Sequence, residues 1–436
     1  MNDADILITN GVVVTMDSKE TVIPKGAVAI SKDRIADIGP SEKFSDCRAG
    51  KVIDAKNGII MPGLINTHTH ASMTCFRGLA DDLNLMTWLN DYIFPAEAKL
   101  NYEKVKTGAL LACAEMILSG TTCFADMYLF ENAVAEAARQ AGMRAVVGEV
   151  LYDFPSPSYG SIEDGFVYTE NLIRKWKDDP LITGAVEPHS PYLCAPELLV
   201  RAGDLSRKYD VPLIIHVAET QTEVNTIFEN YGETPVAHLA EIGVLSPLLL
   251  ACHCVALTEK DIDLLASFDV KVSHNPESNM KLASGIAPVP ELMTAGVCVG
   301  LGTDGCTSNN NIDMFLEMDT AAKIHKVNTL DPTVMDAKTV LKMATRNAAK
   351  ALGLDEVTGS LVPGKKADVI VIDTNKPHLT PMYNLHSHLV YAAGGNDVDT
   401  SVINGQVVME NRQLLTLDIA KVMADVNQIA DEIKNG

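Results

Sequence analysis

Short apolar runs separated by turn residues mark both ends of the chain. In residues 1–57 they predict strands and no long helix, at 6–8, 12–15, 27–30, 34–38 and 52–54. The same pattern returns after residues 361–366, with strands predicted at 368–373, 388–392, 400–403 and 406–409. Asn10-Gly11 and Asn404-Gly405 are typical of two-residue hairpin turns. We therefore expect residues 1–57 and 363–436 to combine into one β domain.

Between these ends the pattern changes to a strand followed by a helix, repeated. Strands are predicted at 59–65, 122–126, 145–150, 182–186, 213–217, 248–251, 270–272 and 297–301. Helical spacing lies between them, for example at 104–118, 133–141, 197–208, 259–268 and 287–295. Eight such units are the count of a (β/α)8 TIM barrel, so the sequence predicts an α/β protein with its barrel in residues 58–362. Residues 418–433 carry a last apolar helical stripe, interpreted as a docking face.

Composition narrows the classes of partner. The 436-residue chain has a net charge of −22, which argues against a nucleic-acid or anionic-membrane partner, because phosphate binding needs clustered Lys and Arg. No apolar stretch reaches the roughly 18 residues of a membrane span, and no secretion signal is visible. Nine cysteines without a CxxC pair suit a reducing cytoplasm. We expect a cytoplasmic protein that acts on a small molecule, and a homo-oligomer is compatible with the sequence.

The candidate chemistry starts at residues 59–70, where an apolar run ends in a His-x-His pair. Side chains alternate faces along a strand, so His68 and His70 point the same way and can share one metal ion. Other candidates follow the later predicted strands: His189, His216 with Glu219, His253, His274 and Asp304. Because the C-terminal ends of barrel strands meet at one mouth, we expect these side chains to lie in one site.

Three imidazoles and one carboxylate, from His68, His70, His216 and Asp304, form a ligand set for a divalent ion, with zinc expected and iron as the alternative. Such an ion lowers the pKa of a bound water from about 16 toward about 7. Glu219 is placed to take the water proton and pass it to a substrate nitrogen.

Two further histidines have weaker assignments. His253 would hold the attacking water or an oxyanion-like intermediate. His274 is interpreted as a residue that organises a loop behind the site.

Several segments together resemble the amidohydrolase superfamily and, within it, the 5-methylthioadenosine/S-adenosylhomocysteine deaminase family. They are MPGLINTHTH, RGLADDLNLMTWL, the Pro95-Ala96-Glu97 segment, EPHSPYLC, IHVAET, HCVAL, VSHNPESNMKL, GLGTDG with SNNNIDMF, and VPGKKADVIVID, in the family's order over nearly the whole chain. The resemblance implies a metal-dependent (β/α)8 TIM barrel with a β-sandwich domain built from both chain termini. It also implies removal of the 6-amino group of adenine nucleosides.

The resemblance implies roles by position. His68, His70, His216 and Asp304 would bind the metal, and Asp304 would also contact the substrate or its attacking water. Glu219 would be the proton shuttle to the purine ring, and His189 would contact the nucleoside. Glu97 would bind the ribose hydroxyls, since a carboxylate can accept two hydrogen bonds. No lysine ends the fourth strand to bridge two metals, so one ion per chain is expected.

One departure from the family concerns the 5′ substituent of the nucleoside. Relatives that accept S-adenosylhomocysteine can carry arginines at the end of the third strand and in the next loop. Here residues 145–166 contain no Arg, Lys or His, and Glu149 would repel a carboxylate if it lay nearby. This favours 5′-methylthioadenosine, then adenosine or 5′-deoxyadenosine, over S-adenosylhomocysteine, because a buried carboxylate without a cation is costly.

Two other classes of function remain open from the sequence. One is a deaminase or chlorohydrolase of another N-heterocycle, such as guanine, a pterin or a triazine, on the same scaffold. Glu97 discriminates against it, since a bare ring gives a ribose-binding carboxylate no purpose. The other is a non-catalytic, metal-binding interaction protein, which the full ligand set together with Glu219 disfavours.

Overall fold

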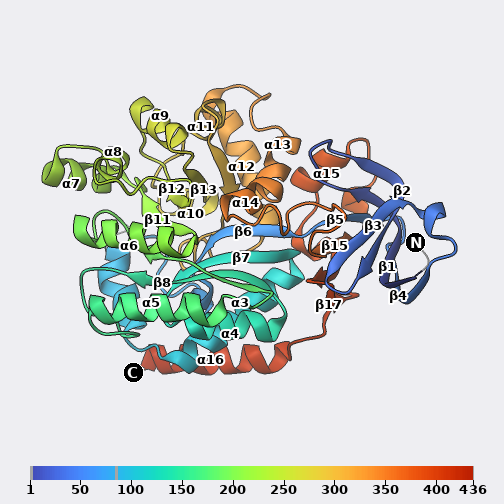
Figure 1. The fold of residues 1–436 in the computed structure, drawn as a ribbon, viewed down its shortest axis with the longest axis horizontal. Coiled ribbons are helices and arrows are strands. Elements are labelled where there is room, and N and C mark those ends of the chain that lie inside the picture. Colours follow the sequence, from blue (N-terminus) through green and yellow to red (C-terminus); the bar gives the residue numbers. More distant parts are fainter. Residues whose placement is uncertain (1–2, 84–86, 436) are drawn as a thin grey trace.

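A barrel of parallel strands forms the centre of the computed structural model, which describes residues 3–83 and 87–435 (Figure 1). Two sheets of parallel strands make it, and the short β9 and β10 share the fourth position. The strands are β6 (Leu64–Thr69), β7 (Thr121–Tyr128), β8 (Arg144–Leu151), β9 (Ile182–Gly184), β10 (Glu187–Pro188), β11 (Leu213–Val217), β12 (Leu249–His253), β13 (Lys271–His274) and β14 (Cys298–Leu301). The Ile214 amide donates to the Val186 carbonyl at 3.0 Å, and the Asp304 amide donates to the His68 carbonyl at 2.9 Å, which joins the two sheets on both sides. The predicted (β/α)8 barrel is confirmed.

Helices follow the barrel strands and cover the outside of the barrel (Figure 1). Their ends follow sequence signals: Ser161 and Thr258 cap α5 and α9 with side-chain oxygens, and Gly142 ends α4 in a left-handed conformation. The helices are η2 (Ala71–Phe76), η3 (Trp88–Ile93), α2 (Phe94–Glu97), α3 (Tyr102–Leu118), α4 (Glu131–Ala141), α5 (Ile162–Trp176), α6 (Pro196–Tyr209), α7 (Gln221–Tyr231), α8 (Pro235–Glu241), α9 (Glu259–Ser267), α10 (Pro276–Lys281), α11 (Val289–Thr294), α12 (Met314–Thr329), α13 (Ala337–Met343) and α14 (Arg346–Ala351).

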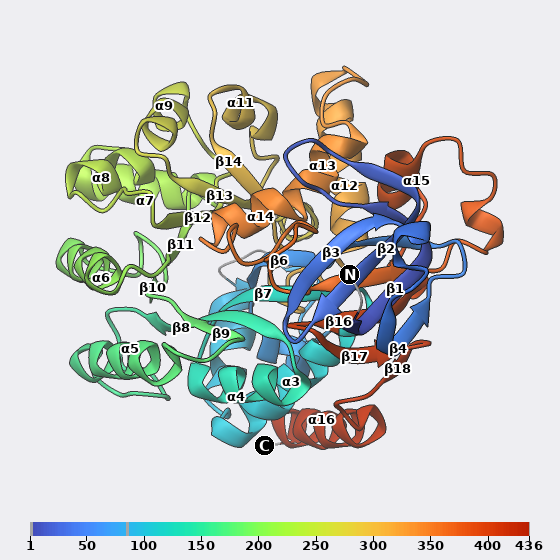
Figure 2. The same cartoon turned by 45° about the vertical axis from the view of Figure 1, so that its right-hand side comes forward.

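The two ends of the chain form a β-sandwich beside the barrel, as expected (Figure 2). Its strands pair in the order β18-β17-β16-β15-β5-β1-β2-β3, with β4 on β1. They are β1 (Asp3–Val14), β2 (Val22–Ser31), β3 (Arg34–Pro40), β4 (Arg48–Asp54), β5 (Ile59–Pro62), β15 (Val369–Ile372), β16 (Val398–Ile403), β17 (Gln406–Glu410) and β18 (Gln413–Leu414), with the short helix η1 (Ser41–Phe44) after β3. Ile8, Val28 and Val371 from three of these strands pack in one buried core.

The strand predicted at 59–65 is two strands. β5 pairs with β1 and β15 of the sandwich, whereas β6 begins the barrel at Leu64. Gly63 lies at the change of sheet, where a Cβ would come within 2.1 Å of Thr122 Oγ1, so only glycine fits. The apolar run hides this division because its residues are buried on both sides of it.

Two predictions about the β domain are wrong. Asn10-Gly11 is not a hairpin turn, because β1 runs through it with a shift of register, and a Cβ on Gly11 would lie 2.7 Å from Ile60 Cγ1. Residues 388–392 are not a strand, because most of them lie in α15 (Leu385–Tyr391). Asn384 caps this helix, and its side chain accepts from the Ser387 amide. The short helices η4 (Pro377–Leu379) and η5 (Gly395–Asp397) flank α15. The hairpin at Asn404-Gly405 is confirmed between β16 and β17.

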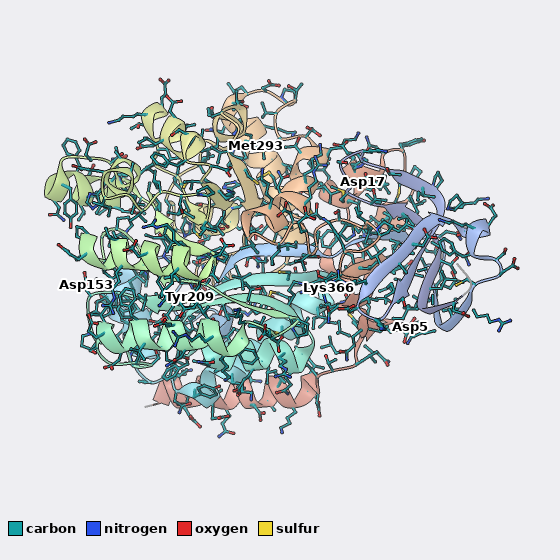
Figure 3. The ribbon with its side chains drawn as sticks, in the orientation of Figure 1. Asp5, Asp17, Asp153, Tyr209, Met293 and Lys366 are labelled. Atoms are coloured by element: carbon teal, nitrogen blue, oxygen red, sulfur yellow. The ribbon has the colours of Figure 1, made fainter. Side chains whose placement is uncertain are left out.

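Contacts between distant segments fix the sandwich and the last helix against the barrel. Arg144 and Asp368 form a buried two-point ion pair, with Nε–Oδ2 at 2.8 Å and Nη2–Oδ1 at 3.1 Å. Within the sandwich domain, Lys366, labelled in Figure 3, pairs with Asp33 and joins its two chain segments. The apolar stripe of α16 (Ile419–Asn435) is buried, which confirms the docking face.

Within residues 3–83 and 87–435, no helix is both long and apolar enough to cross a membrane.

Candidate active site

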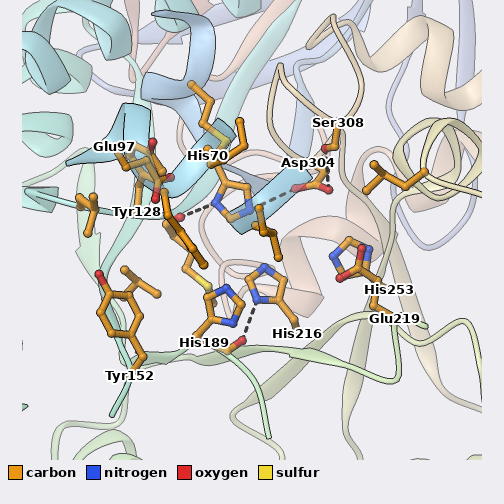
Figure 4. A pocket seen from close by; sticks show the side chains of 18 of the residues that line it. His70, Glu97, Tyr128, Tyr152, His189, His216, Glu219, His253, Asp304 and Ser308 are labelled. Atoms are coloured by element: carbon orange, nitrogen blue, oxygen red, sulfur yellow. Dashed lines mark hydrogen bonds and ion pairs between the residues drawn. The ribbon is translucent and has the colours of Figure 1, made fainter. Parts of the chain in front are cut away.

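A pocket with about 720 Å³ of empty volume opens where the barrel strands end (Figure 4). The predicted site residues that line it are His70, Glu97, His189, His216, Glu219, His253 and Asp304. His68 is buried beside them, with its ring centroid 4.9 Å from those of both His70 and His216. The fold therefore brings His68 and these seven residues together, whereas His274, which the sequence placed in the same group, does not line the pocket.

The four proposed metal ligands lie close together, in two overlapping groups. The ligand atoms of His68, His70 and His216 lie within 4.8 Å of one another. Asp304 Oδ1 lies 3.1 Å from His70 Nε2 and 3.6 Å from His68 Nε2. A second group, His68 with His253 and Asp304, overlaps the first and shares His68 with it.

Backbone carbonyls orient two of the imidazole rings. His70 Nδ1 contacts the Met127 carbonyl, and His216 Nδ1 contacts the His189 carbonyl at 2.7 Å. A carbonyl can only accept, so each Nδ1 carries a proton, and each ring in its neutral form presents a lone pair at Nε2. His68 Nε2 is buried and has no hydrogen-bond partner. Three imidazole lone pairs beside one carboxylate fit a divalent ion such as zinc.

Two serines that the sequence analysis did not single out hold Asp304. Ser278 Oγ donates to Asp304 Oδ2 at 2.6 Å, and Ser308 Oγ donates to the same oxygen at 2.9 Å. The Gly305 amide donates to Oδ1 at 2.8 Å. Both serines lie in segments that carried the family resemblance, but nothing in their local sequence showed which side chain they would reach.

Burial controls the charge states of the histidines. Burial and the neighbouring histidines hold the pKa values of His68 and His216 well below the ordinary value, and burial lowers the pKa of His189 to about 3. These rings are therefore neutral near pH 7, as a metal ligand must be. His70 differs: burial lowers its pKa, but the hydrogen bond and charge of Asp304 raise it to about 9.

Glu219 and His253 both line the pocket, and each interacts electrostatically with Asp304 (Figure 4). Burial and the charge of Asp304 raise the pKa of Glu219 to about 8, which suits a group that takes up and releases a proton near neutrality. His253 Nδ1 faces the side-chain amides of Asn279 at 3.0 Å and Asn275 at 3.3 Å. An amide nitrogen can only donate, so Nδ1 accepts and Nε2–H is the donor of this ring.

The opposite end of the pocket is largely apolar. Glu97 lies at the end of α2, near Tyr128, and burial raises its pKa to about 7. Tyr152 stacks on Phe154 with ring centroids 3.9 Å apart, and Phe94 meets Phe154 edge to face. The apolar lining on this side includes Leu89, Ile93, Phe94 and Val150. No Lys or Arg is among the described residues that line the pocket.

Two sequence arguments change in the light of the structure. Glu149 does not line the pocket, because its carboxylate is buried and accepts from the Phe130 and Glu131 amides at 3.1 and 2.9 Å. Glu149 therefore does not repel a carboxylate substrate as suggested. The preference against S-adenosylhomocysteine then rests only on the lack of Lys or Arg among the described residues that line the pocket. His274 contacts His325 at 3.0 Å between their Nε2 atoms, and it does not line the pocket. Part of the segment RGLADDLNLMTWL, residues 84–86, lies outside the described residues.

A barrel whose strand ends bring three imidazoles together with an aspartate and a buried glutamate is typical of metal-dependent TIM-barrel hydrolases. A family profile described as "Amidohydrolase family" matches residues 59–408, and the chain belongs to this family.

Relatives match almost end to end. A 5-methylthioadenosine/S-adenosylhomocysteine deaminase of Syntrophobacter fumaroxidans is 60% identical over 99% of each chain. A 5′-deoxyadenosine deaminase of Methanosarcina mazei is 47% identical over 99% of this chain and 98% of its own. A crystal structure of an adenosine deaminase from Xanthomonas campestris with bound zinc is 39% identical, covers 100% of both chains and superposes with a TM-score of 0.98.

Proposed function

We propose that this protein is a metal-dependent hydrolytic deaminase of adenine nucleosides, which replaces the 6-amino group by oxygen from water and releases ammonia. The observation that carries the proposal is the convergence of His68, His70, His216 and Asp304 with Glu219 in one pocket. The names of the relatives support an adenine nucleoside as the substrate class.

The four ligands hold one divalent ion per chain, with zinc first and iron second. The unpartnered, buried His68 Nε2 and the two carbonyl-oriented rings support this assignment, and so does the zinc of the Xanthomonas structure. When bound, such an ion supplies Lewis-acid activation of a water molecule at neutral pH.

Glu219 transfers the protons of the reaction. It accepts a proton from the attacking water and delivers it to the purine nitrogen, while the water oxygen bonds to C6. The C6–N bond then breaks, and the amino group leaves as ammonia with a proton that came from the water. Asp304 contacts the attacking water or the substrate. The neutral His253 donates through Nε2–H to the oxygen at C6, which stabilises the charge that develops there.

The other end of the pocket binds the sugar and its 5′ substituent. Glu97 accepts hydrogen bonds from the ribose hydroxyls, and His189 contacts the nucleoside. The rings of Phe94 and Tyr152 offer an apolar surface to an uncharged 5′ group. We therefore place 5′-methylthioadenosine first, then adenosine or 5′-deoxyadenosine, ahead of S-adenosylhomocysteine, because a buried carboxylate without a cation costs several kcal/mol.

The proposed domain division follows the sequence. Residues 58–362 make the catalytic barrel, and 1–57 with 363–436 make the sandwich, to which the barrel segment lends β5. A reducing cytoplasm is the proposed location, since the cysteines are unpaired thiols and most of them are buried.

The test is a substrate panel on the zinc-loaded protein: 5′-methylthioadenosine, 5′-deoxyadenosine, adenosine, S-adenosylhomocysteine, guanine and a chlorotriazine. We expect ammonia and the inosine analogue from the adenine nucleosides, with kcat/KM for 5′-methylthioadenosine at least about tenfold above that for S-adenosylhomocysteine. Turnover of guanine or the triazine in place of the nucleosides would assign the scaffold to another heterocycle. A clear advantage for S-adenosylhomocysteine would contradict the apolar 5′ end.

A further inference from the structure

Three carboxylates sit behind the pocket wall, fully or almost fully buried, and none of them lines the pocket: Asp126, Glu149 and Glu223. Each accepts hydrogen bonds from backbone amides where a barrel strand ends. Two of these strand ends carry a proposed metal ligand or the proposed proton-transfer group, and the third, after β7, carries only residues of the pocket lining. This difference separates a positioning role from an ordinary structural one.

Glu223 holds the turn that carries Glu219. It lies in the first turn of α7, and its Oε1 and Oε2 accept from the amides of Ala218 and Glu219, each at 2.8 Å. Ala218 has a left-handed φ of 52°, a conformation that a residue with a Cβ adopts only when its surroundings hold it there. The pattern Thr220-x-x-Glu223 is typical of a capping box, and Thr220 does cap α7. The carboxylate, however, reaches back past the cap to the two residues before it.

Asp126 holds the segment around His70 in a different way. It lies on β7, and a single oxygen, Oδ1, accepts from the Ala71 amide at 2.5 Å and from Thr69 Oγ1 at 2.6 Å. These two donors flank His70 on both sides. The carbonyl of Met127, the next residue of β7, also orients the His70 ring. One short piece of β7 therefore sets both the main chain and the ring of this proposed ligand.

We propose that Glu223 and Asp126 are positioning residues with separate tasks: Glu223 fixes the proton-transfer group Glu219, and Asp126 fixes the metal ligand His70. The inference rests on the proposed function, which assigns the roles of Glu219 and His70. It goes further because neither carboxylate touches the pocket and each acts through one named residue.

The geometry predicts opposite responses to amide substitution. Asp126 uses one oxygen for both donors, so Asp126→Asn keeps the needed acceptor whereas Asp126→Ala removes it. Glu223 uses both oxygens, so Glu223→Gln keeps one acceptor and turns an NH₂ group toward the other amide. Asparagine should therefore rescue position 126, and glutamine should not rescue position 223.

Glu149 supplies a matched control. Its two oxygens accept from the consecutive amides of Phe130 and Glu131, and Phe130 has a left-handed φ of 56°. This arrangement repeats that of Glu223, Ala218 and Glu219, but the turn, which follows the lining residues Tyr128 and Leu129, carries no proposed metal ligand or proton-transfer group. Glu149→Gln should lower Tm about as much as Glu223→Gln does while leaving kcat and zinc affinity within about threefold.

The role of Glu223 is tested by steady-state kinetics of the zinc-loaded protein with 5′-methylthioadenosine. Glu223→Gln should lower kcat by about 10–100-fold, with KM and zinc content within threefold. In a Glu219→Gln background the same change should cause almost no further loss, because Glu223 acts through Glu219. A kcat within threefold of wild type, or a full additional loss in the Glu219→Gln background, would overturn the assignment.

The Asp126 arm measures zinc affinity by competition with a chelator, which requires no turnover. Asp126→Ala should weaken zinc binding by about 10–100-fold, and Asp126→Asn should stay within about threefold of wild type. Unchanged affinity in Asp126→Ala, or equal losses in both variants, would overturn the role of Asp126. Failure of the proposed function has a different signature, namely zinc-loaded wild-type protein that releases no ammonia.

Discussion

The two ends of the pocket are built differently. At the metal end, His68, His70 and His216 come from barrel strands or the residue after one. His68 and His216 are buried and His70 is half-buried, and backbone carbonyls or neighbouring rings orient all three. At the opposite end, Glu97 and Phe94 lie on a short helix in the long connection between β6 and α3, and Tyr152 follows β8. The side chains there are largely apolar and partly exposed.

We infer that one end of the pocket carries out the reaction and that the other end sets the preference among nucleosides. Strand ends hold ligand atoms in fixed relative positions, as a metal site and a proton-transfer group require. Connections between elements tolerate changes in length and sequence, so they can alter the 5′ substituent without moving the metal end. Substitutions at the metal end should therefore decide whether the protein turns over, and substitutions at the other end should decide which nucleoside it prefers.

The largest expected effect is the loss of the metal. His216→Ala removes one of three imidazole ligands and should abolish both activity and tightly held zinc, measured by elemental analysis. His238→Ala is the control. This histidine lies in α8, packs on Tyr231 at the end of α7 and does not line the pocket. Wild-type protein should hold about one ion per chain, and two tightly held ions would contradict the single ligand set.

Next in size is the loss of the proton shuttle. Glu219→Gln is nearly isosteric but cannot carry the proton, so kcat should fall by ~10²–10⁴-fold while zinc content and Tm stay close to wild type. Near-wild-type deamination by this variant would show that another group moves the proton.

At the sugar end the expected effect depends on the substrate. Glu97→Ala removes an acceptor for the ribose hydroxyls, so kcat/KM should fall by ~10²-fold for 5′-methylthioadenosine and by only a few-fold for its 2′,3′-dideoxy analogue. Kinetics on the two substrates measure this ratio. Equal losses for both would remove the ribose-binding role.

The smallest expected effect is a pH dependence confined to the sugar end. Burial raises the pKa of Glu97 to about 7, so its carboxylate is fully ionised only above that pH and becomes protonated as the pH falls through 7. The KM for ribosides, divided by that for dideoxy analogues, should therefore rise by about tenfold from pH 8 to pH 6. The ratio of the two KM values removes the pH dependence of groups that act on both substrates, such as Glu219. Glu97→Gln should show a flat ratio, and a wild-type ratio without pH dependence would contradict the ionised Glu97.

The sequence predicted the parts that depend on local pattern. Strand-helix alternation and histidines after apolar runs led to the barrel and to a single mouth that gathers His70, His216 and Asp304. It could not show that Gly63 divides one apolar run between two sheets, because both sheets bury that run equally. It also could not show where the carboxylate of Glu149 points, since the direction of a buried carboxylate depends on amides that lie 18 and 19 residues away. Ser278 and Ser308 reach Asp304 only through tertiary contacts, and their local sequence gives no sign of this.

Ammonia release from 5′-methylthioadenosine tests the central claim most directly. The zinc-loaded protein should release one ammonia for each 5′-methylthioinosine formed, with the new oxygen taken from water. Turnover should stop when a chelator removes the metal and return when zinc is added back. Zinc-loaded, folded protein that binds the nucleoside but releases no ammonia would contradict the claim, and so would deamination at an unchanged rate after the metal is removed.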